Sequence, residues 1–182
     1  HSHGDPQINK GIFEDSQIKD RPLSDYEGDW QSVYPYLQDG SLDPVWKHKS
    51  EGSDRTAEQI RTEYDAGYKT NVERITIEGD KVSFYEDGKP AAGHYTYDGY
   101  EVLTYKKGNR GVRFIFKKTE GDAEAPQFIQ FSDHGIYPAK AHHYHLFWGN
   151  DRAALLDEVV NWPTYYPSAL NSKQIVEELI AH

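Results

Sequence analysis

Between residues 72 and 148, apolar and polar residues alternate in short runs that are separated by turn residues such as 86–88 and 107–109. Alternation with a period of two is typical of β-strands that have one buried face. An earlier stretch, rich in aromatic and β-branched residues, stops before Pro35 and has the same character. We therefore expect seven strands, at 28–34, 72–78, 81–85, 93–105, 111–118, 127–133 and 142–148.

A second pattern, with apolar residues three or four positions apart, predicts helices on both sides of the main run of strands. Asp43 followed by Pro44 is a typical helix start, and Ile60 and Tyr64 share one helical face. The segment 162–167, WPTYYP, contains two prolines, and we expect it to break the helix before it. The predicted helices lie at 43–48, 56–64, 151–160 and 172–180.

Strands in series that are joined by tight turns form an antiparallel meander, and closure into a barrel removes its exposed edges. We expect a mainly β fold, a barrel with additional α-helices, as one domain over residues 13–182. Residues 1–12 are polar, contain Gly and Pro and lack periodicity, so we expect a mobile N-terminal arm. Its His1 and His3 fit equally well the remainder of an expression tag and a weak metal-collecting tail.

The composition narrows the possible ligands. The 30 acidic and 20 basic residues give a net charge of −10, which disfavours nucleic acid and anionic membranes as partners and favours cations. No stretch approaches the roughly 18 apolar residues that a membrane span needs. Because cysteine is absent, a transition-metal site has to be built from His, Asp and Glu. The chain starts at His1 without Met, so we expect a mature or trimmed chain.

Four of the nine histidines lie within the segment 133–149, DHGIYPAKAHHYHLFWG. If the last two predicted strands pair as an antiparallel hairpin, His134 lies opposite His143, and strand alternation places His145 on the same face. Three imidazoles can hold Zn²⁺ at about 2.0–2.1 Å per bond and leave a fourth position for water or another donor. An H-x-H pair on a strand is also common as two surface or hydrogen-bonded side chains, so the spacing alone leaves that alternative open.

The histidine face of this hairpin also carries Gln130 and Phe147, whereas Tyr144 and Leu146 point to the other face. We expect the histidine face to line the barrel interior, so that the site lies in a polar mouth above an aromatic floor. Other chemistry is scarce. The segment 108–111 is a turn without the strand–loop–helix context of a phosphate-binding loop, and no serine lies in a G-x-S-x-G motif.

Several longer blocks extend this interpretation: LSDYEGDWQSVYPYLQDGSLDPV, YDGYEVLTYKKGNRGVRF, IQFSDH, HHYHLFWGND and NWPTYYP. With these blocks the chain resembles, from about residue 11 onwards, the ZinT (YodA) family of bacterial extracytoplasmic zinc- and cadmium-binding proteins. The resemblance implies a lipocalin-like (calycin-type) barrel with helical additions. The metal ligands of the family are one histidine after the QFSD block and two in the following H-x-H, which here are His134, His143 and His145.

The resemblance also implies a role. Such proteins recruit Zn²⁺ during scarcity together with the substrate-binding protein of a zinc ABC importer, either as a separate protein or as a domain fused to it in a lipoprotein. We therefore expect a non-enzymatic, extracytoplasmic and monomeric protein, in the periplasm or on the outer face of a Gram-positive membrane. Imidazole sites also accept Cd²⁺, Ni²⁺, Co²⁺ and Cu²⁺. The histidine-rich tail of the family is reduced here to His1-Ser2-His3, and the cysteine pair of some members is missing.

Two alternatives from other functional classes remain at this point. A zinc-dependent hydrolase could use a water bound to three histidines, but it also needs a base or proton shuttle, and the sequence assigns no carboxylate to that place. A lipocalin-like carrier of a small apolar molecule fits the predicted barrel and the aromatic content of 14%. Only an analogy of fold supports the carrier.

Overall fold

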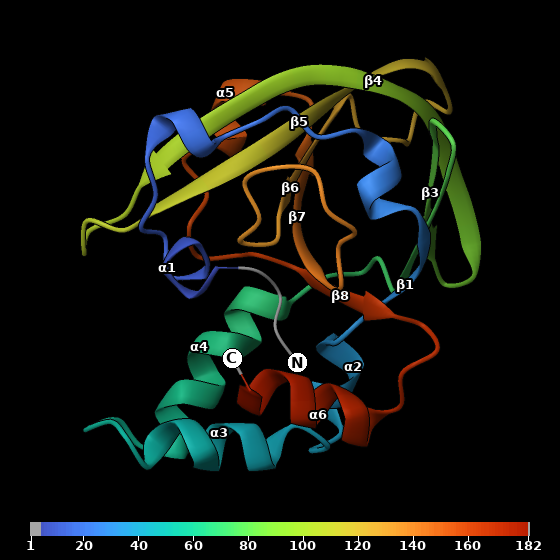
Figure 1. Ribbon diagram of the computed structural model, residues 1–182. Helices are drawn as coiled ribbons and strands as arrows, with labels where there is room; N and C mark the ends of the chain where they lie inside the picture. Colours follow the sequence, from blue (N-terminus) through green and yellow to red (C-terminus); the bar gives the residue numbers. More distant parts are fainter. Residues whose placement is uncertain (1–4, 182) are drawn as a thin grey trace.

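The computed structural model describes residues 5–181 of the chain. Eight antiparallel strands follow one another in chain order around a closed barrel, and the last strand pairs with the first (Figure 1). This arrangement confirms the predicted barrel with additional helices. The strands are β1 (Gly28–Ser32), β2 (Arg74–Glu78), β3 (Lys81–Glu86), β4 (Lys89–Thr104), β5 (Arg110–Gly121), β6 (Phe128–Ser132), β7 (Tyr144–Gly149) and β8 (Thr164–Pro167).

Alternate residues of each strand fill the barrel interior, as a period of two requires. Tyr26, which precedes β1, adds to this core by stacking on Phe131 of β6 at a ring-centroid distance of 4.0 Å. The interior is therefore packed with side chains. Its members include Trp30, Ile75, Ile77, Val82, Phe84, Tyr95, Val112, Phe114, Phe116, Ile129, Phe131, Tyr144, Leu146 and Tyr165.

Strand β8 was not predicted, because the two prolines of WPTYYP indicate a helix break. Thr164, Tyr165 and Tyr166 have the β-branched and aromatic side chains that favour strands, and Pro163 and Pro167 limit the strand to four residues. The strand is short, but it closes the barrel between β7 and β1.

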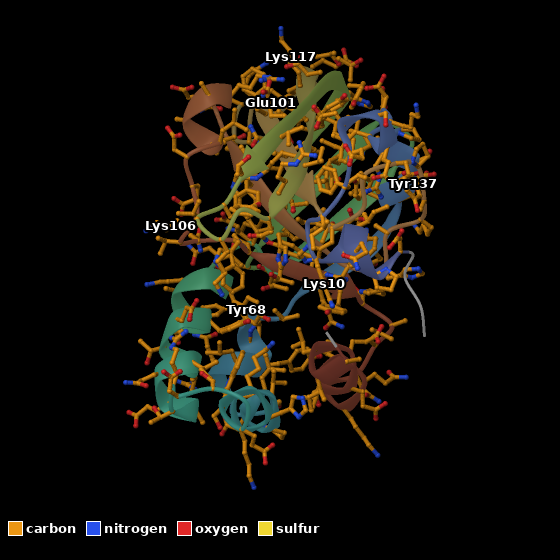
Figure 2. All side chains as sticks on the ribbon, turned by 60° about the vertical axis from the view of Figure 1, so that its left-hand side comes forward. Lys10, Tyr68, Glu101, Lys106, Lys117 and Tyr137 are labelled. Carbon is orange, nitrogen blue, oxygen red and sulfur yellow. The ribbon has the colours of Figure 1, made fainter. Side chains whose placement is uncertain are left out.

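Four helices form a layer on one side of the barrel: α2 (Tyr34–Gln38), α3 (Asp43–Ser50), α4 (Ala57–Tyr68) and α6 (Ser172–Ala181) (Figure 1). A second buried core holds this layer together and includes Tyr166, which belongs to the outer face of β8. Gly67 in the last turn of α4 lies so close to Trp162 that a Cβ atom there would clash with the indole ring. Tyr68 lies where α4 meets the barrel (Figure 2). The helices predicted near 43–48, 56–64 and 172–180 are thus confirmed.

The helix predicted at 151–160 is shorter than expected, because α5 spans only Arg152–Leu155. Asp151 caps it, since its carboxylate accepts a hydrogen bond from the Ala154 N–H. Beyond the helix, Arg113 of β5 donates to the carbonyl oxygens of Leu155 and Glu158 at 2.6 and 2.9 Å. These contacts and the following β-branched valines favour an irregular segment that runs back to β8.

Three short helices, α1 (Pro6–Asn9), η1 (Asp15–Gln17) and η2 (Leu23–Tyr26), precede the barrel. Ile8 is only 6% exposed and belongs to the barrel core, and the Gly11 carbonyl accepts a hydrogen bond from the Arg110 N–H at 2.9 Å. The described part of the predicted arm, residues 5–12, thus contacts the barrel through Ile8 and Gly11. The mobility of the arm and its boundary near residue 12 stay predictions. His1 and His3 lie outside the described residues.

Candidate metal centre

Strands β6 and β7 bring three histidines to one place. His134 lies two residues after β6, His143 immediately precedes β7, and His145 belongs to β7. The register pairs Ser132 with His145. Continued by two residues, this register sets His134 opposite His143, as the predicted hairpin requires.

The three rings form a nearly regular triangle. Their centroids are 6.2 Å apart for His134 and His143, 5.9 Å for His134 and His145, and 6.0 Å for His143 and His145. One ring nitrogen of each residue lies within 4.8 Å of the other two. Tetrahedral bonds of about 2.0–2.1 Å need nitrogens about 3.3 Å apart, so modest side-chain rotations would close the triangle around an ion. Among the His, Asp and Glu residues in 5–181, these three histidines form the group whose possible metal-ligand atoms all lie this close together.

The position of this triangle corrects one prediction, because the histidine face is the outer face of the barrel. Phe131 and Leu146, on the opposite face of the same two strands, belong to the barrel core. Strand alternation shows which residues share a face, but both faces of this hairpin carry aromatic residues. The apolar pattern therefore gave no reliable sign of which face was interior.

Thr164 of β8 orients His145. The His145 Nδ1 atom lies 2.6 Å from Thr164 Oγ1, and this hydroxyl donates its own proton to the Trp162 carbonyl at 2.9 Å. Since the only hydroxyl proton is committed to Trp162, His145 Nδ1 is the donor in the shared bond. Its Nε2 atom is thereby left with the lone pair that a metal ion needs.

Aromatic rings pack against His145, which belongs to β7, and against His143, which immediately precedes this strand. His143 stacks on Tyr166 with a centroid distance of 5.1 Å and an interplanar angle of 10°. His145 meets Trp162 edge to face at 5.7 Å. His143 is 9% exposed, and His145 is half-buried. These contacts restrict both rings before an ion arrives.

His134 is held differently. It is exposed, and its backbone adopts the left-handed conformation with φ +67°. Few residues other than glycine adopt this conformation, although histidine is among the more tolerant ones. The surrounding loop must therefore impose it.

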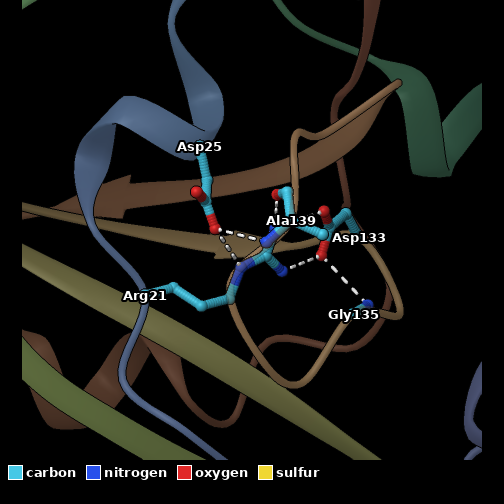
Figure 3. A network of polar contacts seen from close by, with 5 residues as sticks. All are labelled: Arg21, Asp25, Asp133, Gly135 and Ala139. Atoms are coloured by element: carbon cyan, nitrogen blue, oxygen red, sulfur yellow. Dashed lines mark hydrogen bonds and ion pairs between the residues drawn. The ribbon is translucent and has the colours of Figure 1, made fainter.

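A buried ion-pair network fixes this loop (Figure 3). Arg21 donates to both carboxylate oxygens of Asp133, at 2.6 and 3.0 Å, and to Asp25 at 3.0 Å. It also donates to the Ala139 carbonyl at 2.9 Å. The Arg21 side chain is 1% exposed. Burial alone would lower the pKa of Arg21, but Tyr26 and Asp133 outweigh it and the pKa is raised, so the guanidinium is charged.

Gly135 completes the turn beside His134. Its N–H donates to Asp133 Oδ1 at 3.1 Å, and a Cβ atom at this position would lie 2.7 Å from Arg21 Nη1. Only glycine leaves room for the guanidinium there. The residue on each side of His134 therefore contacts the Arg21 network.

A family model described as "ZinT (YodA) periplasmic lipocalin-like zinc-recruitment" matches residues 4–182. The chain belongs to the ZinT family. The closed barrel agrees with the term lipocalin-like in the family description. The resemblance seen in the sequence blocks is confirmed.

Individual ZinT relatives agree with this assignment. The chain is 60% identical over 177 residues to "Probable metal-binding protein YrpE" of Bacillus subtilis strain 168, covering 97% of this chain and 70% of the relative. It is 50% identical over 180 residues to "Zinc-binding protein AdcA" of Streptococcus pyogenes serotype M1, covering 96% of this chain but only 35% of AdcA. The chain therefore spans about a third of the length of that relative.

A solved structure has the same fold. The Zn(II)-bound ZinT-like domain of Streptococcus pneumoniae AdcA superimposes with a TM-score of 0.92 at 44% identity, covering 95% of this chain and 97% of that one.

No helix within residues 5–181 combines the length and the apolar character needed to cross a membrane.

In this ZinT-family chain the three histidines border a hollow of about 310 Å³ between the barrel and the helical layer. Two further hollows, of about 660 and 500 Å³, also reach His134. The site is thus accessible from outside the protein. The residues that line the hollow of about 310 Å³ are Lys49, Tyr64, Tyr68, His134, His143, His145, Trp162, Thr164, Tyr166 and Leu179.

The residues that support the histidines, Thr164 and Arg21, were not predicted from the sequence. Thr164 could have been found if TYY had been recognised as a strand, because β7 needs a neighbour on its free side. Arg21 carries no local signal, since its contact with Asp133 spans 112 positions. The other three described histidines are outside the triangle: His94 lies 2.7 Å from Asp80 at the surface, His48 is exposed on α3, and His142 is exposed next to His143.

Proposed function

We propose that the chain captures one Zn²⁺ ion through His134, His143 and His145 and releases it to a zinc importer outside the cytoplasm. The observation that carries this proposal is the convergence of three ring nitrogens within 4.8 Å of one another. The family description and the Zn(II)-bound ZinT-like domain of AdcA support zinc as the ion. Imidazole ligates metals in its neutral form, and a set of three suits zinc and also admits Cd²⁺, Ni²⁺, Co²⁺ and Cu²⁺.

Capture and release fit the site better than catalysis does. Three protein ligands leave one position of a tetrahedral ion open, where an acceptor protein can enter and displace water. Among the described residues, no Asp or Glu lines the hollow of about 310 Å³ that all three histidines share. A hydrolase would need a base or proton shuttle there. The packed barrel interior likewise gives no support to a carrier of apolar molecules.

The relatives support a location and a partner. Proteins named zinc-binding lipoprotein AdcA contain a region 45% identical to this chain, which covers 35% of their length. We infer that this domain works beside a substrate-binding component of a zinc ABC importer, in the same polypeptide or in a separate one. That interaction takes place in the periplasm or on the outer face of the membrane.

Zinc titration of protein purified without a histidine tag tests the proposal. The wild type should bind one equivalent, and the double variant His143→Ala, His145→Ala should lose tight binding. The matched control is His94→Ala, which removes an exposed histidine outside the triangle. Tight one-to-one binding that survives in the double variant would overturn the proposal.

A further inference from the structure

A lysine side chain lines the hollow of about 310 Å³, although a second positive charge opposes the binding of a zinc ion there. Apart from the histidines, Lys49 is the only titratable cationic side chain among the described residues that line it. Lys49 belongs to α3 and is half-buried, and its Nζ atom lies 5.5 Å from the centroid of the Tyr64 ring. It therefore enters the hollow from the helical layer, whereas the histidines enter from the barrel.

Aromatic contacts connect the two sides of this hollow. Tyr64 meets Trp162 edge to face at a centroid distance of 5.1 Å, and Trp162 meets His145 in the same way at 5.7 Å. Lys49 and the three histidines thus line one common space, and Tyr64 and Trp162 form part of its wall. The space is large enough for a small organic group beside the ion.

Lys49 has no acidic partner within residues 5–181, because none of the ion pairs found there includes it. Burial lowers the pKa of its ammonium group, since the charged form loses water. The chain has 30 acidic residues, yet none of them forms an ion pair with Lys49 in the part of the chain that the structure describes. A half-buried positive charge near a bound divalent cation opposes binding unless an anion lies between them.

We propose that this hollow is a carboxylate subsite, in which one carboxylate fills the open coordination position of the bound ion and accepts a hydrogen bond from Lys49. This inference rests on the function proposed above. A carboxylate oxygen is an ordinary zinc ligand, and a charge-assisted hydrogen bond to an ammonium group strengthens its retention. The carboxylate comes from a free small acid or from an Asp or Glu side chain of the acceptor protein, and the chemistry is the same in both cases.

The cobalt-loaded protein provides the readout, because a tetrahedral Co²⁺ ion absorbs visible light that responds to its fourth ligand. Titration of the wild-type Co²⁺ protein with acetate should change this absorption in a saturable way. Lys49→Met should weaken acetate binding about tenfold, the value of one charge-assisted hydrogen bond. The matched control is Lys47→Met, which removes an exposed lysine of the same helix outside the hollow and should leave acetate binding unchanged.

Lys49→Glu gives a second, independent readout. The new side chain places a carboxylate in the hollow, so this variant should bind Zn²⁺ more tightly than the wild type in acetate-free buffer. Its cobalt spectrum should already resemble that of the acetate-saturated wild type and should no longer respond to acetate. A gain in affinity without the spectral change would mean a general charge effect and would count against the subsite.

A peptide with blocked ends and a single glutamate distinguishes the two sources of the carboxylate. Tighter binding of this peptide than of acetate indicates a side chain of a partner protein, and the reverse indicates a free small acid. The subsite is overturned if neither ligand changes the cobalt spectrum, or if Lys49→Met responds like the wild type. If the wild type fails to bind Co²⁺ and Zn²⁺ at all, the proposed function fails instead.

Discussion

The two sides of the histidine triangle are built in different ways. On the strand side, formed by His143 and His145, ring positions follow from the register of β6, β7 and β8 and from contacts with Tyr166 and Thr164. On the loop side, formed by His134, the residue is exposed and has a left-handed backbone. Its place depends on a buried guanidinium from a distant segment of the chain.

This difference shows which interactions position each histidine before an ion binds. Backbone pairing and aromatic packing are distributed over many contacts, so the loss of any one side chain removes only a small part of the stabilisation. A buried ion pair concentrates its effect in a few atoms, since removal of one partner leaves the other charged and without compensation. The fold of the strand side should therefore survive the replacement of one neighbouring side chain, whereas the fold of the loop side should depend strongly on Arg21.

The largest expected effect is that of Arg21→Met. The variant leaves Asp133 and Asp25 buried without their counter-charge, so we expect a loss of about 3–5 kcal/mol in the free energy of unfolding. Zinc affinity should fall as well, because the loop that carries His134 loses its anchor. Urea denaturation of the metal-free protein and zinc titration of the folded variant measure the two effects.

The control for Arg21→Met is Arg74→Met, which breaks an ion pair with Asp29 whose two side chains are both 46% exposed. Exposed pairs contribute about 0–1 kcal/mol, so stability should change little and zinc affinity not at all. If Arg21→Met lowers stability while the folded protein keeps wild-type zinc affinity, the network does not prepare His134.

The next effect concerns the strand side. Thr164→Val removes the acceptor of the His145 Nδ1–H, and loss of such a partner lowers metal affinity about 10–100-fold. Thr164→Ser retains the hydroxyl and should bind zinc nearly as well as the wild type. Competition with a chromogenic chelator measures both affinities. Equal affinities of the valine and serine variants would show that Thr164 does not determine the tautomer of His145.

The same comparison explains how much of the site could be predicted from the sequence. The alternation from Phe128 to Ser132 and from Tyr144 to Trp148 predicts two neighbouring strands. Once these strands are assumed to pair as a hairpin, the meeting of His134, His143 and His145 follows, and the structure has this register. The face toward which they point depends on which of two aromatic surfaces the helices cover, and no local pattern contains that information. The Arg21 contact was equally out of reach, because it joins two segments that lie next to each other only in the folded chain.

The smallest expected effect is also the sharpest contrast between the two sides, because it changes sign. At position 134 the left-handed backbone, with φ +67°, favours glycine, so metal-free His134→Gly should be more stable than His134→Ala by about 1 kcal/mol. At position 145, inside β7, glycine adds only chain entropy, and His145→Gly should be less stable than His145→Ala by about 0.5–1 kcal/mol. All four variants lack a ligand, so the measurement is urea denaturation without metal, and zinc does not affect the comparison. The same order at both positions would mean that the loop relaxes once the imidazole is gone, and that the left-handed turn is a property of His134 and not of the Arg21 network around it.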